Sequence, residues 1–191
     1  MKKHWILLVL LALLLTGCGQ TEDRHPDWDA GWARFGDLLA AETPADFSPG
    51  EYNDALSLGG IWYASFNAGG GAETIVNAEG EDAEVYDAEL FLLVQECADE
   101  GQAQATVKDW IARERENYRS TEPTEYRAEK QSWQLMELTE ANTDNPYSRG
   151  LAAFAVRGSL AISAELICRD TYTGDATAVV QAFLNGIHYG E

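Results

Sequence analysis

Apolar residues recur at two different spacings along the chain, and the changes between them predict its helices and strands. Three segments place apolar residues every three or four positions, as one face of a helix requires. The first, residues 26–41, begins at Pro26 and carries Trp28, Trp32, Phe35 and Leu39 on that face. The other two are residues 102–118 and residues 175–188, and Thr173 or Asp175 can cap the last of these.

The remaining apolar segments alternate with polar residues or are apolar throughout, which is typical of strands. Six strands are predicted, over residues 60–67, 73–77, 85–96, 126–139, 151–156 and 160–168. Residues 43–54 contain two prolines and a glycine and are predicted to be a loop, and residues 142–149 a turn. Because short turns join most of these strands, we expect an α+β fold: a single twisted, mainly antiparallel sheet with helices packed against it.

The first 17 residues differ from the rest and have the pattern of an export signal. Lys2 and Lys3 precede an apolar run of 11 residues from Trp5 to Leu15. At about 1.5 Å per residue such a helix is roughly 16 Å long, about half the hydrocarbon thickness of a membrane. The run ends in Leu15-Thr16-Gly17-Cys18, which resembles the lipobox of bacterial lipoproteins. The resemblance implies cleavage before Cys18 and attachment of lipid to its thiol.

We therefore expect a signal peptide over residues 1–17, a lipidated tether over residues 18–26 and one domain over residues 27–191. Acyl chains on Cys18 would anchor the protein in a cell membrane or outer membrane, facing outside the cytoplasm. Loss of residues 1–17 removes two lysines and takes the net charge from −19 to −21. A surface so acidic disfavours binding to nucleic acid or to anionic lipid and attracts cations or basic polypeptides.

From Gly60 onward, the order of strands, helix, strands and terminal helix resembles the PsbP-like fold. The resemblance is one of element order and carries no residue motif, and it implies binding or assembly rather than catalysis. The additional helix predicted around Trp28 and Trp32 leaves a cystatin-like roll as the alternative, in which a leading helix packs into a curved sheet.

Few residues suggest chemistry. His188 alone among the three histidines lies in the domain away from its tether, and the expected end of the last helix accounts for it. Cys97 and Cys168 can form a disulfide outside the cytoplasm or remain buried thiols. Trp62 and Phe66 share one face of a strand and Tyr63 the other, and we assign these rings to the core rather than to sugar binding.

Two acidic stretches could coordinate calcium, although solvated turns explain both and no metal site is assigned. One holds Glu79, Glu81, Asp82 and Glu84, and the other Glu140, Asn142 and Asp144; neither has the EF-hand pattern. No cofactor is expected.

One segment departs from the acidic character of the chain. Residues 108–130 hold six acidic and six basic residues, the basic ones being Lys108, Arg113, Arg115, Arg119, Arg127 and Lys130. This segment is either a contact face for an envelope protein or a helix laced with its own ion pairs. We expect a membrane-anchored, non-catalytic binding or assembly module of the bacterial cell envelope. The alternatives are a calcium-binding lipoprotein and an envelope hydrolase.

Overall fold

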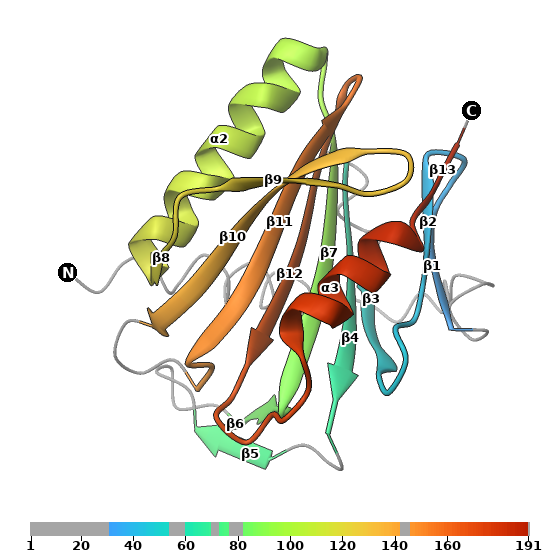
Figure 1. The fold of residues 1–191 in the computed structure, drawn as a ribbon. Helices are drawn as coiled ribbons and strands as arrows, with labels where there is room; N and C mark the ends of the chain where they lie inside the picture. The colour runs from blue at the N-terminus through green and yellow to red at the C-terminus, as the bar shows by residue number, and fades with distance from the viewer. Residues whose placement is uncertain (1–30, 54–59, 70–72, 77–81, 142–145, 191) are drawn as a thin grey trace.

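The structure is a computed structural model, and it describes residues 31–53, 60–69, 73–76, 82–141 and 146–190 (Figure 1). Residues 1–30, with the expected signal, the lipidation site Cys18 and the tether, lie outside the described residues. The described chain forms thirteen strands and two helices: β1 (Trp32–Phe35), β2 (Leu39–Glu42), β3 (Ser48–Asn53), β4 (Ile61–Ala68), β5 (Glu73–Val76), β6 (Asp82–Val85), β7 (Ala88–Glu96), α2 (Glu100–Asn117), β8 (Tyr118–Ser120), β9 (Thr124–Arg127), β10 (Ser132–Ala141), β11 (Arg149–Arg157), β12 (Leu160–Cys168), α3 (Ala176–Asn185) and β13 (His188–Tyr189).

An eight-stranded sheet is the centre of the fold. Its strands run in the order β3-β4-β7-β12-β11-β10-β8, with β9 paired to β10, and every pairing is antiparallel. The long strands β7, β11 and β12 lie in the middle, and β11 and β12 form the hairpin that the sequence predicted. The expected α+β class is confirmed.

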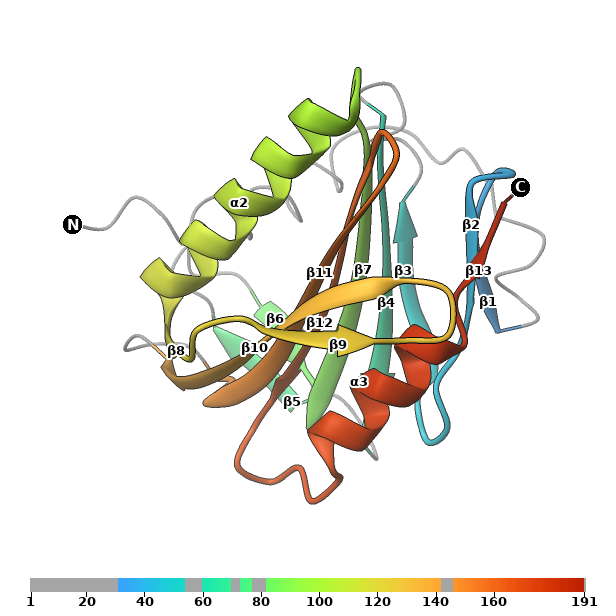
Figure 2. The same ribbon diagram turned by 45° about the horizontal axis from the view of Figure 1, so that its top comes forward.

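The two helices lie on opposite faces of this sheet (Figures 1 and 2). Alternate residues of each central strand point to opposite sides, so each central strand contributes side chains to both faces of the sheet. Leu90, Leu92 and Val94 of β7 pack in the core beneath α3, whereas Leu93 packs in the core beneath α2. Both faces of the central strands are therefore apolar, as the sequence predicted for residues 85–96.

The helix expected over residues 26–41 is wrong within the described residues. Trp32–Phe35 and Leu39–Glu42 form a hairpin, and β2 also pairs with β13 in a small separate sheet. Phe35 and Leu39 fit both a helical spacing and an alternating one, but Gly36 adopts a φ of +57° in the turn between them. Glycine costs about 1 kcal/mol inside a helix and takes such a φ without strain. Within residues 32–42, this hairpin takes the place of the leading helix that the cystatin-like alternative needs.

Three boundaries of the predicted strands also differ. The loop expected over residues 43–54 contains the edge strand β3, whose register shifts after Pro49, and edges are where proline is tolerated. The strand expected over residues 126–139 is the hairpin β9–β10, closed by a hydrogen bond from Ala128 N to Gln131 O of 3.0 Å. The strand expected over residues 85–96 begins at Ala88, because Val85 ends the separate strand β6.

Neither described helix combines the length and the apolar character that membrane spanning requires.

Candidate functional site

The two cysteines of the domain are both buried and both free. Cys168 ends β12 opposite Ala88, the first residue of β7, and Cys97 follows the last residue of β7. Nine residues of strand separate the two positions by roughly 30 Å, whereas a disulfide needs Cα atoms within about 7 Å. The disulfide considered for this pair is therefore not formed. Burial raises the pKa of the Cys168 thiol to about 11, so this thiol is a poor nucleophile.

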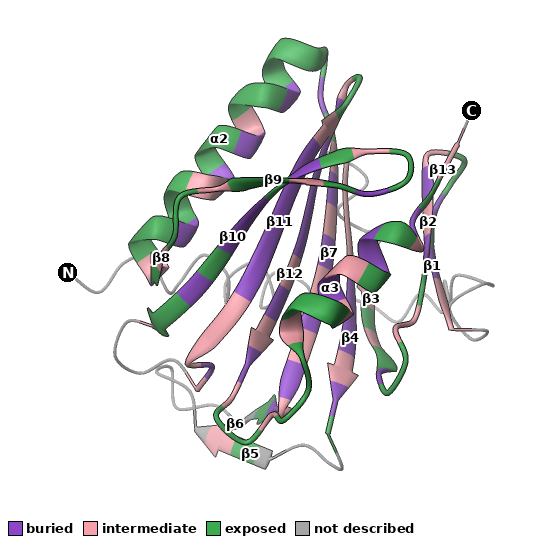
Figure 3. Ribbon diagram, in the orientation of Figure 1, coloured by how far each residue is buried: buried purple, intermediate pink, exposed green. Residues whose placement is uncertain are grey.

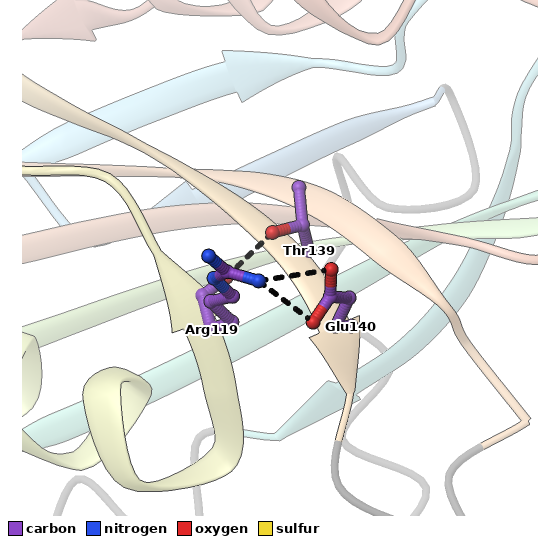
Figure 4. A network of polar contacts seen from close by, with 3 residues as sticks. All are labelled: Arg119, Thr139 and Glu140. Atoms are coloured by element: carbon purple, nitrogen blue, oxygen red, sulfur yellow. Dashed lines mark hydrogen bonds and ion pairs between the residues drawn. The ribbon is translucent and has the colours of Figure 1, made fainter.

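The six basic residues of the mixed-charge segment are all exposed, but two of them are neutralised locally. Arg119 Nη1 lies 3.2 Å from both carboxylate oxygens of Glu140, while Thr139 Oγ1 donates to Arg119 O at 2.9 Å (Figure 4). Arg115 Nη2 lies 2.6 Å from Glu122 Oε2. Lys108 and Arg113 lie on α2, and Arg127 and Lys130 belong to the β9–β10 hairpin. A contact role for this segment stays a prediction.

The remaining candidates from the sequence are accounted for by packing. Phe66 is fully buried and Trp62 packs against the same core, while Tyr63 lies on the other face and stacks on Phe91 at 5.8 Å. His188 lies in β13 rather than at a helix end, with its ring 5.7 Å from that of Trp32.

Of the acidic stretches considered for calcium, Glu140 is engaged by Arg119, and Glu84 accepts a hydrogen bond of 2.9 Å from Tyr86 Oη. Glu79, Glu81, Asn142 and Asp144 lie outside the described residues, as does the side chain of Asp82. In the ranges that the structure covers, no group of three metal-binding side chains converges.

Three carboxyl groups that the sequence analysis did not single out lie on the face of the sheet that α2 packs against. They are the pair Glu114 on α2 and Glu165 on β12, together with Glu89 on β7, whose neighbours are Tyr147 and Glu51 rather than that pair; for their shared face of the sheet we call the three the carboxyl cluster. Each has a pKa raised above its ordinary value, and burial is the largest cause in all three. Perturbed carboxyl groups gather at functional sites more often than elsewhere, so this cluster is the candidate site.

Glu114 continues the buried stripe of α2, which runs through Ala103, Val107 and Trp110 at helical spacing. Its side chain is only 8 % exposed and lies within hydrogen-bonding distance of the Glu165 carboxyl. Burial raises the pKa of Glu114 to about 7 against the lowering effects of Arg113 and of that hydrogen bond. Burial and the nearby Glu114 together raise the pKa of Glu165.

Glu89 has a different partner, the phenol of Tyr147, which donates a hydrogen bond to its carboxylate. Tyr147 is 6 % exposed, and its oxygen also accepts from Tyr86 N at 3.3 Å. Burial raises the pKa of Glu89 to about 7, although the Tyr147 hydrogen bond lowers it. The Tyr147 pKa is raised by burial first and by the Glu89 charge second.

A shallow groove of about 230 Å³ lies on the same face of the sheet, between α2 and strands β10 and β11. Val107, Ile111 and Val156 form its apolar floor, and Gln104, Lys108 and Gln134 line it with polar groups. Among the described residues that line this groove, Lys108 is the single ionisable one, so the carboxyl cluster does not open into it.

The sequence did contain a signal for the cluster. Glu114 occupies a position four residues after Trp110 on an otherwise apolar helical stripe. Glu165 sits between Ser163 and Ile167 on one face of a strand whose other face is wholly apolar. An acidic residue at a position where the sequence pattern predicts a buried apolar side chain is rare, so it indicates a candidate functional site.

Comparisons with known proteins find likeness at the level of structure. No protein-family model matches the chain, and no curated protein matches it. The solution structure of the cyanobacterial PsbP protein CyanoP from Synechocystis sp. PCC 6803 is similar to it, with 11 % sequence identity and a TM-score of 0.45 over 92 % of this chain and 99 % of that one. A likeness of this size concerns the fold alone and says nothing about what the chain binds.

Proposed function

We propose that the chain is a lipoprotein anchored outside the cytoplasm through Cys18, and that its domain is a non-catalytic binding or assembly module. The observation that carries the anchoring is the sequence Leu15-Thr16-Gly17-Cys18 at the end of an 11-residue apolar run. That run is too short to remain as an ordinary span, and a thiol with small residues before it is what lipid attachment and cleavage require. Two or more acyl chains then hold the domain at the membrane.

Two properties of the domain support binding rather than catalysis. The carboxyl groups with raised pKa lie beneath α2 or against Tyr147, and the groove on the same face of the sheet is lined by neutral side chains and Lys108. A general acid or base has to reach its substrate within about 3 Å, and the described groove brings none of the three carboxyl groups to its lining. The groove is instead lined by three apolar and three polar side chains, and Lys108 and Ile111 join it to the mixed-charge segment, where acidic and basic residues balance.

Anchoring is tested by intact-mass analysis of the protein isolated from membranes of its host. We expect a mass that lacks residues 1–17 and carries acyl groups on Cys18. Cys18→Ser should leave the precursor unprocessed and without lipid, whereas the matched control Cys97→Ser, which changes a buried thiol, should be processed normally. Full-length protein without lipid in the wild type would refute the anchor.

Binding is tested by placing a photo-crosslinking amino acid at Lys108, at the edge of the groove, in cells. A discrete adduct is expected there, and none is expected at the control position Ala178, which is exposed on α3 on the opposite face of the sheet. The partner in the adduct should be an envelope protein. Failure to obtain a specific adduct at Lys108 or Arg113 would overturn the binding role and leave the anchor standing.

A further inference from the structure

The contact between α2 and β12 includes two carboxyl groups that face each other. Glu114 comes from the last turn of α2, and Glu165 comes from the centre of β12, opposite Phe91 of β7 and Ala152 of β11. No donor group among the described residues reaches the buried Glu114 Oε2, and the Glu165 carboxyl lies within hydrogen-bonding distance of Glu114. Glu114 is buried and Glu165 is half-buried. The buried residues of α2 lie on the side of the helix that faces the sheet (Figure 3).

Two ionised carboxylates cannot remain at this separation without a large cost. Their repulsion grows as burial lowers the local dielectric constant, and the negative end of the α2 dipole lies at the same place as Glu114. One proton shared by the pair turns repulsion into a hydrogen bond with an ionised acceptor, which is among the stronger kinds. The docked geometry is therefore the geometry of a protonated pair.

The charged and titratable groups described around Glu114 and Glu165 do not neutralise the pair in place of that proton. On α2, Arg113 lies close enough to Glu114 to lower its pKa, but its side chain points into solvent. On β4, the Tyr63 phenol is close enough to Glu165 to sense its charge and is itself neutral at physiological pH. β7 contributes Phe91 beside Glu165, with Glu89 two residues further along, and β11 contributes Ala152. On β8, Arg119 is engaged by Glu140.

We propose that Glu114 and Glu165 form a proton-dependent latch, which holds the C-terminal half of α2 on the sheet while they share a proton and releases it when they do not. The step is an acid dissociation: the shared proton passes to water, both carboxylates become charged, and the helix end moves away from β12. The rest of α2 is held by Ala103, Val107 and Trp110 and by the Asp99 cap, whose Oδ1 accepts from Gln102 N at 2.8 Å.

The latch gives the groove a dependence on pH. Gln104, Val107 and Lys108 lie in the half of α2 that stays docked, whereas Ile111 lies in the half that is released, so release alters the surface to which the proposed partner binds at Ile111. This step of the inference rests on the proposed binding function, whereas the latch itself does not. A negative crosslinking result at Lys108 would leave the latch intact, and a pH-independent helix would leave the binding function intact.

Hydrogen exchange of the α2 amides, measured by mass spectrometry between pH 5 and pH 8 and corrected for intrinsic exchange, tests the latch. Each retained proton makes the opening equilibrium change about tenfold per pH unit between the pKa values of the open and docked states. We expect opening of residues 111–117 to increase at least tenfold from pH 5 to pH 7 in the wild type. In the double variant Glu114→Gln with Glu165→Gln, which removes both titrating groups, this increase should fall to less than threefold.

Two controls separate the latch from a general effect of acid groups. Glu89→Gln removes the third carboxyl with a raised pKa, which is half-buried, and should leave the pH dependence of α2 unchanged. Glu137→Gln removes an exposed carboxyl on β10 and should do the same. If the glutamine variants fail to fold, carbon-13 NMR titration of the glutamate carboxyls in the wild type replaces them. Exchange of α2 that is independent of pH, or titration of both Glu114 and Glu165 near 4.5, would overturn the proposal.

Discussion

An aromatic ring pair joins α3 to the sheet, and replacing one of its rings should weaken the whole domain. Phe183 of α3 is 4 % exposed, and its ring meets that of Phe66, which is fully buried on β4, edge to face at 5.5 Å and 64°. Val180 and Leu184 are the other buried residues of this helix. Phe183→Ala therefore removes the largest side chain that α3 contributes to the core.

The expected cost has two parts that a second substitution separates. Phe183→Ala should lower the free energy of unfolding by about 3 to 5 kcal/mol, since a buried phenylalanine leaves a cavity that the surrounding sheet closes only partly. Phe183→Leu refills most of that volume and should cost about 1 to 2 kcal/mol, part of which is the lost ring geometry. With Phe66→Leu, a double-mutant cycle should give a coupling of about 0.5 to 1.5 kcal/mol.

Urea denaturation followed by tryptophan fluorescence measures all of these values. Thr177→Ala, on the exposed side of α3, is the matched control and should change the free energy of unfolding by less than about 0.5 kcal/mol. A cost below about 1 kcal/mol for Phe183→Ala, or a coupling of zero with Phe66, would refute this account of how α3 packs.

Glu89, Gly150 and the two thiols test other parts of the structure. Because the pKa of Glu89 is raised to about 7, the folded state holds a proton that the unfolded state releases. The free energy of unfolding should therefore fall as pH rises from about 4.5 to 7. Glu89→Gln should reduce that fall by up to about 3 kcal/mol in urea titrations repeated across this range. Gly150→Ala should destabilise by about 2 kcal/mol or more in urea denaturation, because its Cβ would lie 2.4 Å from Leu166 O. Since Cys97 and Cys168 are free, a reductant should leave the melting temperature unchanged, and both thiols should react with iodoacetamide only after unfolding.

The central part of the fold could be predicted from the sequence because its patterns have one interpretation. Residues 160–168 are apolar at nearly every position, which only a strand covered on both faces explains at that length. The spacing of Val107 and Trp110 fits a helix and does not alternate. Asp175 was one of two predicted caps for the last helix, and its Oδ1 accepts from Ala178 N at 3.0 Å.

The secondary-structure prediction failed where the apolar residues of a short segment fit both a helical and an alternating spacing, or where a turn lacked its usual residues. Phe35 and Leu39 are four residues apart, which suits a helical face as well as the two strands of a hairpin. The turn between β9 and β10 contains Glu129 and Lys130 instead of glycine, proline or asparagine, so nothing marked it as a turn. In both cases long-range pairing, with β13 and with β11 respectively, determines the structure.

The candidate site could be predicted only in part, because its chemistry depends on a distance that no local pattern contains. Glu114 and Glu165 are 51 positions apart in the sequence, and each alone is a single irregularity in an apolar pattern. Their effect on each other arises only when α2 crosses β12, since a carboxylate raises the pKa of another carboxyl only at close range. In a chain with 32 acidic residues, abundance makes most of these groups uninformative. What distinguishes this pair is burial. Two carboxyl groups that lie together away from water need a positive partner, and for this pair we propose that a shared proton takes that role.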